Sequence, residues 1–224
     1  MLQLRNVFKR FGDSEPWVLK DLSFTLEPGE GVLIQGRSGS GKTTLLHIIS
    51  GLEPPIEGAV LFNGRNISTL DDASLATFRN KHIGFCFQDV HVQRHLTVLE
   101  NVMLPLLLRG EILSEAARRG GEILERLGLG GFACKIPSVL SGGQGQRLVL
   151  GRAMIGEPDI LLADEPTGNL DEETAKDILK MILDYQKTSG SALVLVTHDA
   201  IPPSYNLRRY ILSDCHLKAH DDLC

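Results

Sequence analysis

A glycine-rich stretch that ends in a lysine and a threonine is the first part of the chain whose residue types and spacing could do chemistry. Residues 36–43 fit the pattern G-x-x-x-x-G-K-[ST] of a phosphate-binding loop. An apolar, strand-like run at 32–34 precedes the loop and a helical pattern at 42–50 follows it, which is the context that this loop requires. The sequence therefore predicts nucleotide binding here rather than an ordinary Gly/Ser turn. The predicted binding residues are Gly36, Arg37, Ser38, Gly39, Ser40, Gly41, Lys42, Thr43 and Thr44.

Each part of this loop has a chemical task. The glycines allow successive backbone N–H groups to face the phosphates, and the N-terminus of the following helix adds partial positive charge. Lys42 is expected to reach the β- and γ-phosphates, and the Thr43 hydroxyl is expected to ligate Mg²⁺.

Two adjacent carboxylates form the second candidate group. Asp164 and Glu165 follow an apolar run at 160–163, and ligands of parallel sheets bind where the strands end. Because successive side chains of a strand point to opposite sides, one carboxylate can hold the metal while the other faces an attacking water. We assign Asp164 to Mg²⁺ and Glu165 to the role of general base, the alternative being a solvated acidic turn.

The elements that must position these residues follow an α/β pattern. The first two apolar patterns predict an antiparallel, hairpin-like part, and the later alternation of strands and helices favours a mainly parallel sheet with helices on both faces. Between residues 89 and 156 the strand patterns give way to helical ones. The expected strands are 2–7, 22–26, 32–34, 59–62, 83–87, 160–163, 192–196 and 210–212, and the expected helices are 42–50, 70–79, 98–108, 114–127, 142–155 and 172–186.

The length of 224 residues fits one large domain with an inserted part. We expect an α/β fold of the P-loop NTPase type, with a parallel-sheet core, an N-terminal antiparallel β part and an inserted helical subdomain. In this division the nucleotide-binding core comprises residues 1–88 and 157–224, and the helical subdomain comprises residues 89–156.

Composition and charge exclude several classes of protein. With 23 basic and 28 acidic side chains the net charge is −5, which argues against nucleic acid as the principal ligand. The apolar run at 102–108 is far shorter than the roughly 20 residues of a membrane-spanning helix. Residues 1–6 carry charge where a signal peptide is apolar, and the four cysteines have no repeated C-x-x-C spacing. These observations predict a cytosolic location and free thiols.

A third motif separates the classes of phosphate-binding-loop protein. Residues 140–144 read Leu-Ser-Gly-Gly-Gln, directly before a predicted helix. Ser141 is a favoured N-cap residue, and Gly142 and Gly143 leave N–H groups of the first helical turn free to bind an anion. The motif lies in the helical part of the chain and not beside the phosphate-binding loop of its own sheet.

With four other motifs, this segment resembles the ATP-binding cassette (ABC) ATPases, whose signature motif is LSGGQ. The five motifs occur in the order of that family, and the resemblance covers the chain from about residue 2 to residue 212. A soluble P-loop kinase would lack the signature. The motifs are the loop at 36–43, Gln88 after a strand, the signature at 140–144, the run Asp-Glu-Pro-Thr-Gly-Asn-Leu-Asp at 164–171, and His198 after a strand.

The resemblance implies a shared ATPase site. In ABC ATPases two cassettes bind ATP between them, head to tail, and the signature of one covers the γ-phosphate held by the other. The resemblance thus implies ATP and Mg²⁺ as ligands, a second copy of this chain as partner, and ATP hydrolysis as the reaction. The signature residues so assigned are Ser141, Gly142, Gly143 and Gln144.

The remaining site residues are also implied by the resemblance. Gln88 would contact Mg²⁺ and the attacking water, and His198 would stabilise the γ-phosphate in the transition state. The turn at 168–171 would lie at the dimer interface, with its last residue capping the next helix. Phe11 would stack on adenine, although core packing is a rival role and Trp17 is the alternative stacking residue.

Two features depart from the family or lie outside its motifs. Gly145 stands where many relatives carry glutamine, inside the predicted signature helix, and should cost about 0.5–1 kcal/mol of helix stability. The tail at 215–224 contains cysteines and histidines, and on a helix His216 and His220 would share one face. A frayed terminus is the simpler interpretation of the tail, and a Zn²⁺ site is the alternative.

Some details resemble one branch of the family. The run at 96–106 and the run at 164–171 are similar to those of bacterial lipoprotein-releasing ATPases and their relatives in macrolide export, peptide export and cell division. The branch implies separate integral membrane permease subunits as partners, with this chain peripheral at the cytoplasmic face of the inner membrane. An importer ATPase and the ATPase of a cell-division complex that does not transport remain alternatives.

Overall fold

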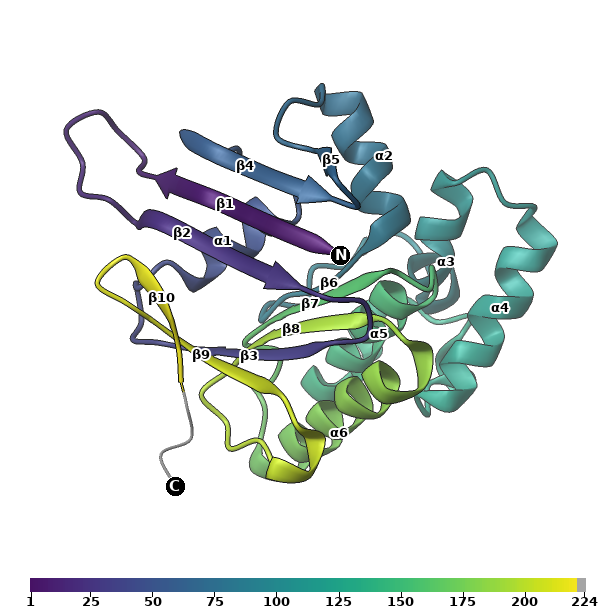
Figure 1. The fold of residues 1–224 in the computed structure, drawn as a ribbon. Coiled ribbons are helices and arrows are strands. Elements are labelled where there is room, and N and C mark those ends of the chain that lie inside the picture. The colour runs from purple at the N-terminus through teal and green to yellow at the C-terminus, as the bar shows by residue number, and fades with distance from the viewer. Residues whose placement is uncertain (221–224) are drawn as a thin grey trace.

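The computed structural model describes residues 1–220, in which two β-sheets are surrounded by helices (Figure 1). The smaller sheet is antiparallel and contains the N-terminal strand, as the sequence predicted. In spatial order its strands are β2 (Leu19–Leu26), β1 (Leu2–Lys9), β4 (Glu57–Phe62) and β5 (Arg65–Asn66).

The larger sheet is parallel except at one edge, where its last strand runs antiparallel to its neighbour. This arrangement confirms the predicted α/β fold class with a parallel-sheet core. In spatial order the strands are β10 (His216–Ala219), β9 (Arg208–Ser213), β3 (Gly31–Gln35), β8 (Ala192–Val196), β7 (Ile160–Asp164) and β6 (Ile83–Cys86).

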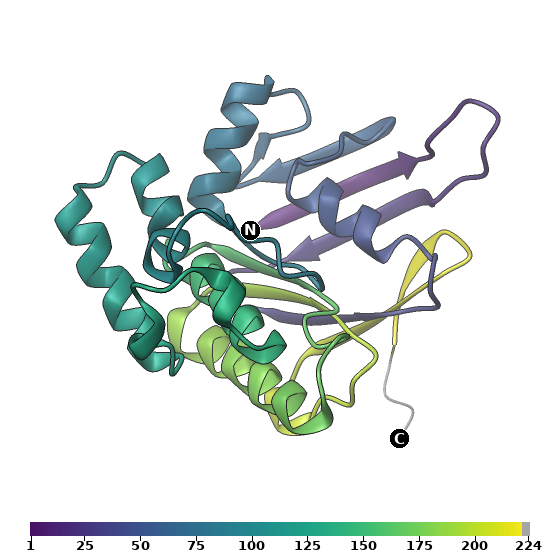
Figure 2. The same ribbon diagram turned by 180° about the vertical axis from the view of Figure 1, so that it is seen from behind.

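The helices form two groups around the larger sheet. Helix α1 lies between the two sheets and α2 packs in the same core, beside the smaller sheet, whereas α3 to α6 contribute to the core on the opposite face of the larger sheet (Figures 1 and 2). The helices are α1 (Lys42–Ile49), α2 (Asp72–His82), α3 (Val98–Leu108), α4 (Leu113–Arg126), α5 (Gly142–Met154) and α6 (Glu172–Ser189). None of these described helices combines the length and apolar character needed to cross a bilayer.

Each central strand of the larger sheet divides its side chains between two cores. In β7, Leu161 faces the core formed with α3, α4, α5 and α6, while Ile160 and Leu162 face the core that α1 and the smaller sheet complete. Because both faces are covered, such strands are apolar throughout, which explains the continuous apolar runs in the sequence. Full burial of one such side chain contributes roughly 1.5–3 kcal/mol, so the sheet is a rigid support for the loops at its ends.

The helical part begins and ends with specific polar contacts. Thr97 and Glu100 form a capping box that starts α3. Arg109, which follows α3, donates hydrogen bonds to the carbonyl oxygens of Asn80 at the end of α2 and of Gly156 after α5, the latter at 2.8 Å. One guanidinium therefore connects the end of α3 with α2 and with the segment that follows α5.

The C-terminal segment differs from its predicted form. The expectation that His216 and His220 share a helical face is wrong, because residues 216–219 form strand β10, which pairs with β9. Four residues along a strand span about 13 Å, too far for two histidines to bind one ion. No group of His, Cys, Asp or Glu able to hold a metal ion exists among residues 1–220, and the part of the predicted tail at 221–224 lies outside the described residues.

Candidate functional site

The carboxyl ends of β3, β6, β7 and β8 meet at one edge of the larger sheet, and the predicted site residues follow these ends. A cleft of about 660 Å³ opens there. It brings together residues from five separate segments of the sequence, as a site at the ends of parallel strands requires. Its lining comprises Phe11, Val18, Ser38, Gly39, Gly41, Lys42, Thr43, Thr44, Gln88, Asp164, Glu165, Gly168 and His198.

The loop at 36–43 is shaped by two glycines that no other residue could replace without strain or collision. Gly41 has φ = 101°, in the region that side chains disfavour, and it is the residue before α1. At Gly36 a Cβ atom would lie 2.5 Å from the carbonyl oxygen of Leu212. The predicted residues Gly36, Arg37 and Ser40 are not among those that line the cleft, although the hydroxyl of Ser40 is buried without a hydrogen-bond partner among the described residues.

Lys42 is only 8% exposed and its ammonium group stays inside the loop. Its Nζ donates to the carbonyl oxygens of Gly36 at 2.8 Å and Arg37 at 3.1 Å. Among residues 1–220 this buried ammonium is held by two neutral carbonyls and by no carboxylate, so the loop carries a positive charge suited to an anion.

Thr43 and Asp164 meet in the cleft, with the Thr43 hydroxyl donating to Oδ2 of Asp164 at 2.7 Å. A hydroxyl and a carboxylate in contact are oxygen ligands of the kind that Mg²⁺ prefers. Gln88, the third predicted metal ligand, lines the same cleft, and its amide lies against Gly168, where a Cβ atom would be 2.9 Å from Nε2. The donor set of these three side chains therefore fits a magnesium ion.

Glu165 has an unusual backbone, with φ = 44°. This left-handed conformation is strained for a glutamate and is maintained by a hydrogen bond from its N–H to the carbonyl of Val196 at 2.8 Å. The carboxylate lies 3.0 Å from Nε2 of His198 and accepts a hydrogen bond from the His198 backbone N–H at 3.3 Å. The conformation thus directs the carboxylate into the cleft beside the histidine.

The two candidate stacking aromatics have different surroundings. Phe11 lines the cleft and is 64% exposed, and the Lys9 ammonium lies over its ring, 5.2 Å from the centroid. Trp17 packs edge-on against Phe8, with ring centroids 5.5 Å apart, and the Arg10 guanidinium lies over the Trp17 ring, 4.8 Å from its centroid. Of the two, only Phe11 belongs to the cleft lining.

The signature residues lie apart from this cleft. Ser141 is the N-cap of α5, where its hydroxyl accepts from the Gln144 N–H at 3.3 Å while Oε1 of Gln144 accepts from the Ser141 N–H at 2.9 Å. Neither they nor Gly142 and Gly143 belong to its lining. Within one copy the described residues therefore form only part of the predicted site.

A buried contact connects the signature helix with the segment that carries Gln88. From α5, Gln146 donates to the carbonyl oxygen of Phe87 at 2.8 Å, and the same amide lies 3.5 Å from the sulfur of Cys86. Burial raises the pKa of the Cys86 thiol to about 12, so this thiol stays neutral at physiological pH. The start of the signature helix and Gln88 are thereby held in a fixed relation.

Sequence reasoning missed two kinds of residue at the site. Val18 lines the cleft although nothing in its residue type suggested a role. The Thr167 hydroxyl donates a short hydrogen bond of 2.5 Å to Oδ2 of Asp199, which joins the loop after β7 to the loop after β8. The proximity of Asp199 to His198 in the sequence was the only available signal. Asp171 caps α6 through the Thr174 N–H at 3.0 Å, as predicted.

Gly145→Ala is expected to stabilise the protein. A Cβ atom at this position would meet only Val90, at 3.2 Å from Cγ1, and the 40% exposed Val90 side chain can move aside. Since glycine costs about 0.5–1 kcal/mol relative to alanine in a helix, the melting temperature should rise by about 1–4 °C in calorimetry. Gly151→Ala in the same helix is the control: its Cβ would lie 2.7 Å from Cδ1 of buried Leu127 and should lower the melting temperature. A lower value for Gly145→Ala as well would contradict this account.

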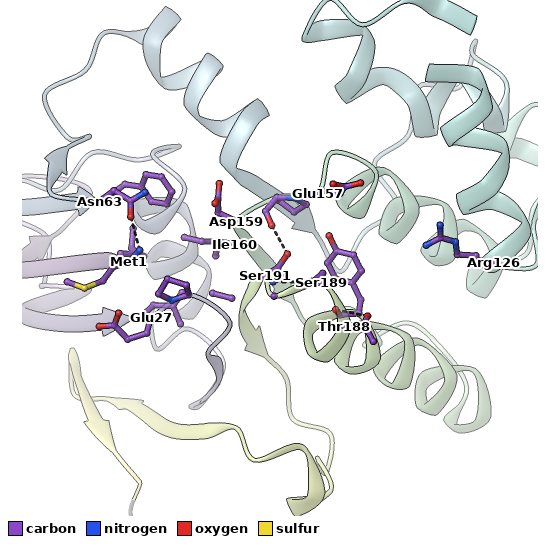
Figure 3. A pocket seen from close by; sticks show the side chains of 18 residues that line it. Met1, Glu27, Asn63, Arg126, Glu157, Asp159, Ile160, Thr188, Ser189 and Ser191 are labelled. Atoms are coloured by element: carbon purple, nitrogen blue, oxygen red, sulfur yellow. Dashed lines mark hydrogen bonds between the residues drawn. The ribbon is translucent and has the colours of Figure 1, made fainter. Parts of the chain in front are cut away.

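A second cavity, of about 640 Å³, lies at the opposite end of the larger sheet, where β7 and β8 begin (Figure 3). There the amino group of Met1 donates to Asn63 at 2.9 Å, and the Ser191 hydroxyl donates to the carbonyl of Pro158 at 2.6 Å. Its carboxylates and Arg126 are spread over the wall, and no sequence motif falls among them. The motif-bearing cleft is therefore the candidate functional site.

Comparison with known sequences identifies close relatives. The sequence model of the ABC transporter family matches residues 19–168. The chain is 41% identical over 201 residues to the "Lipoprotein-releasing system ATP-binding protein LolD" of Alcanivorax borkumensis, which covers 89% of this chain and 88% of that protein. The protein of the same name from Geobacter metallireducens is 42% identical over 216 residues and covers 96% of each chain.

Solved structures with the same fold are also found. The dimeric structure of a post-hydrolysis state of the ATP-binding cassette MJ0796, bound to ADP and Pi, has a TM-score of 0.90 and 37% identity over 100% of this chain and 99% of that chain. The structure of cbiO1 from Clostridium perfringens, part of the ABC transporter complex cbiONQ, has a TM-score of 0.85 and 26% identity, covering 97% and 86% of the two chains.

Proposed function

The chain belongs to the ABC transporter family, and we propose that it is the ATP-hydrolysing subunit that drives a separate membrane-embedded subunit in lipoprotein release. The observation that carries the proposal is the cleft, where the Glu165–His198 pair, the Thr43–Asp164 pair and the loop at 36–43 face one space. No single one of these groups would suffice, because phosphoryl transfer requires phosphate binding, metal binding and a base in one place.

In this proposal the cleft binds ATP through the phosphates and the adenine ring of the nucleotide. The backbone N–H groups of the loop and Lys42 bind the phosphates, and the ring of Phe11 contacts adenine. Thr43, Asp164 and Gln88 would hold Mg²⁺, which would neutralise charge on the phosphates when bound. The carbonyl contacts of Lys42 are replaced by phosphate oxygens, which are better partners for an ammonium group.

Hydrolysis follows from the position of Glu165. Its carboxylate takes a proton from a water whose oxygen attacks the γ-phosphorus, and the bond from that phosphorus to the bridging oxygen breaks, releasing ADP and phosphate. His198, 3.0 Å from the carboxylate, is placed to donate to the γ-phosphoryl group as charge redistributes. Gln88 contributes an amide that can orient the water.

We infer that two copies complete the site. The signature residues lie outside the cleft of their own copy, and the first-turn N–H groups of a helix such as α5 have no acceptor within the helix, so they can bind an anion. A second copy arranged head to tail would bring this helix end to the γ-phosphate. The dimeric structures of MJ0796 support this arrangement for a chain of the same fold.

The membrane partner and the lipoprotein substrate are supported by the names of two relatives that match nearly the whole chain. The helical part at 89–156 is the proposed docking side for integral membrane permease subunits, which would hold the chain peripherally at the cytoplasmic face of the membrane. In proteoliposomes of the complete complex, ATP and Mg²⁺ should transfer a lipid-modified protein to an acceptor in solution.

The shared site predicts that turnover depends on protein concentration. At low concentration the wild-type protein should sediment as a monomer, and its specific ATPase activity should rise as concentration increases, because a dimer must form in each cycle. Addition of ATP and Mg²⁺ should produce a dimer only transiently, seen in analytical ultracentrifugation. A monomer whose specific activity is constant over a hundredfold dilution would contradict the shared site while leaving ATP binding intact.

A further inference from the structure

The turn that joins β9 to β10 has a conformation that its residues do not favour. Ser213 pairs with His216, so the connection is a two-residue turn of Asp214 and Cys215, with φ = 50° and 65°. Two successive positive φ values define a type I′ turn, in which the second position favours glycine. A cysteine in this position has a strained backbone conformation, which contacts of its side chain can offset.

The Cys215 side chain reaches the loop between β1 and β2. Its thiol donates to the carbonyl oxygen of Trp17 at 2.8 Å, and its carbonyl oxygen accepts from the Lys20 N–H at 2.9 Å. Both views of the fold show the hairpin tip against the start of β2 (Figures 1 and 2). The last hairpin of the described chain thus holds a loop that is almost 200 residues away in sequence.

That loop forms one wall of the ATP cleft. Val18, the next residue after Trp17, lines the cleft and packs on the phosphate-binding loop, since a Cβ atom at Gly41 would lie 2.8 Å from Cγ1 of Val18. The Val18 N–H donates to the carbonyl of Lys9 at 2.8 Å, which closes the loop that carries Phe11. A displacement of the Trp17 carbonyl would therefore move the wall that Phe11 and Val18 provide.

We propose that Cys215 is a positioning residue for the wall of the nucleotide cleft that contacts adenine, an inference that rests on the proposed ATPase function. The thiol fixes the Trp17 carbonyl, and the wall at residues 10–18 is ordered before ATP arrives. If this wall had to become ordered during binding, the affinity for the adenine of ATP would be weaker, because the conformational freedom that the wall loses opposes binding. The phosphate contacts of Lys42 and the loop at 36–43 do not depend on this hydrogen bond.

Two ligands distinguish the contribution of the adenine contacts to affinity from the contribution of the phosphate contacts. Dissociation constants for ATP with Mg²⁺ and for inorganic tripolyphosphate with Mg²⁺ are measured by calorimetry for wild type, Cys215→Ala, Cys215→Gly and Cys215→Ser. Cys215→Ala and Cys215→Gly should weaken ATP by about threefold, as expected for loss of one modest hydrogen bond, and leave tripolyphosphate unchanged. Cys215→Ser retains a donor and should restore most of the affinity for ATP.

A spectroscopic measurement reports on the wall itself. Trp17 is the single tryptophan of the chain, so its fluorescence reads this loop directly. Acrylamide quenching of Trp17 should increase in Cys215→Ala and Cys215→Gly and remain at the wild-type level in Cys215→Ser. Cys134→Ala, which removes an exposed free thiol from the helical part, is the matched control and should behave as wild type in both measurements.

Two outcomes would overturn the proposal. Wild-type affinity for ATP in Cys215→Ala would show that the thiol does not position the wall, and an equal loss for ATP and tripolyphosphate would show general damage to the cleft. Cys215→Gly distinguishes strain from anchoring, because it relieves the turn and yet lacks the donor. Failure of the proposed ATPase function is seen separately, as wild-type protein that binds neither ligand.

Discussion

Glu165→Gln is expected to bind ATP with wild-type affinity and to hydrolyse it at least about a hundredfold more slowly. The amide keeps the size of the carboxylate but cannot accept the proton of the attacking water. Since ATP then persists between two copies, the variant should accumulate as a stable dimer with ATP and Mg²⁺. Single-turnover hydrolysis and analytical ultracentrifugation measure the two effects.

The chain offers a matched control for this substitution. Glu157 is also a glutamate with positive φ, 48°, three residues before the start of β7, but it lies at the opposite end of the sheet. Glu157→Gln should hydrolyse ATP at the wild-type rate. Normal turnover in Glu165→Gln would remove this residue as the base, and a monomeric variant with bound ATP would contradict the shared site instead.

Lys42→Ala is expected to lower the affinity for ATP by about a hundredfold, because the loop loses its buried positive charge and a donor to two phosphates. The carbonyls of Gly36 and Arg37 also lose their donor, so circular dichroism and a melting curve must show that the variant folds. Calorimetric titration with ATP measures the affinity.

Lys176→Ala controls for the change in net charge. Lys176 is exposed on α6, where it pairs with Glu172, and removing an exposed pair of this kind changes stability little. Its affinity for ATP should equal that of wild type. If Lys42→Ala also retained wild-type affinity, the phosphate-binding role of the loop would be wrong.

Much of the architecture was predictable because its signals are local. The phosphate-binding loop, the strand that ends in Asp164 and the N-cap at Ser141 each depend on residues within one turn or strand. The fold class followed from the alternation of strand and helix patterns along the chain. Continuous apolar runs predicted strands covered on both faces, and the two cores explain those runs.

The rest depends on contacts between distant segments. Nothing near Val18 in sequence indicates the cleft wall, and the position of Asp199 next to His198 does not indicate its hydrogen bond to Thr167. Strand β10 carries few apolar residues and forms because it pairs with β9, so its tertiary partner outweighs a weak local preference. The choice between Phe11 and Trp17 required the neighbours of each ring, which only the folded chain provides.

The left-handed backbone of Glu165 has a consequence for engineering. Glycine or asparagine would adopt φ = 44° at lower cost than glutamate, so heat resistance and turnover make opposite demands on this one position. A laboratory screen that scores only resistance to thermal unfolding would enrich replacements at residue 165 and select stable proteins without ATPase activity. Thermostable variants of this chain must therefore be selected under a requirement for phosphate release.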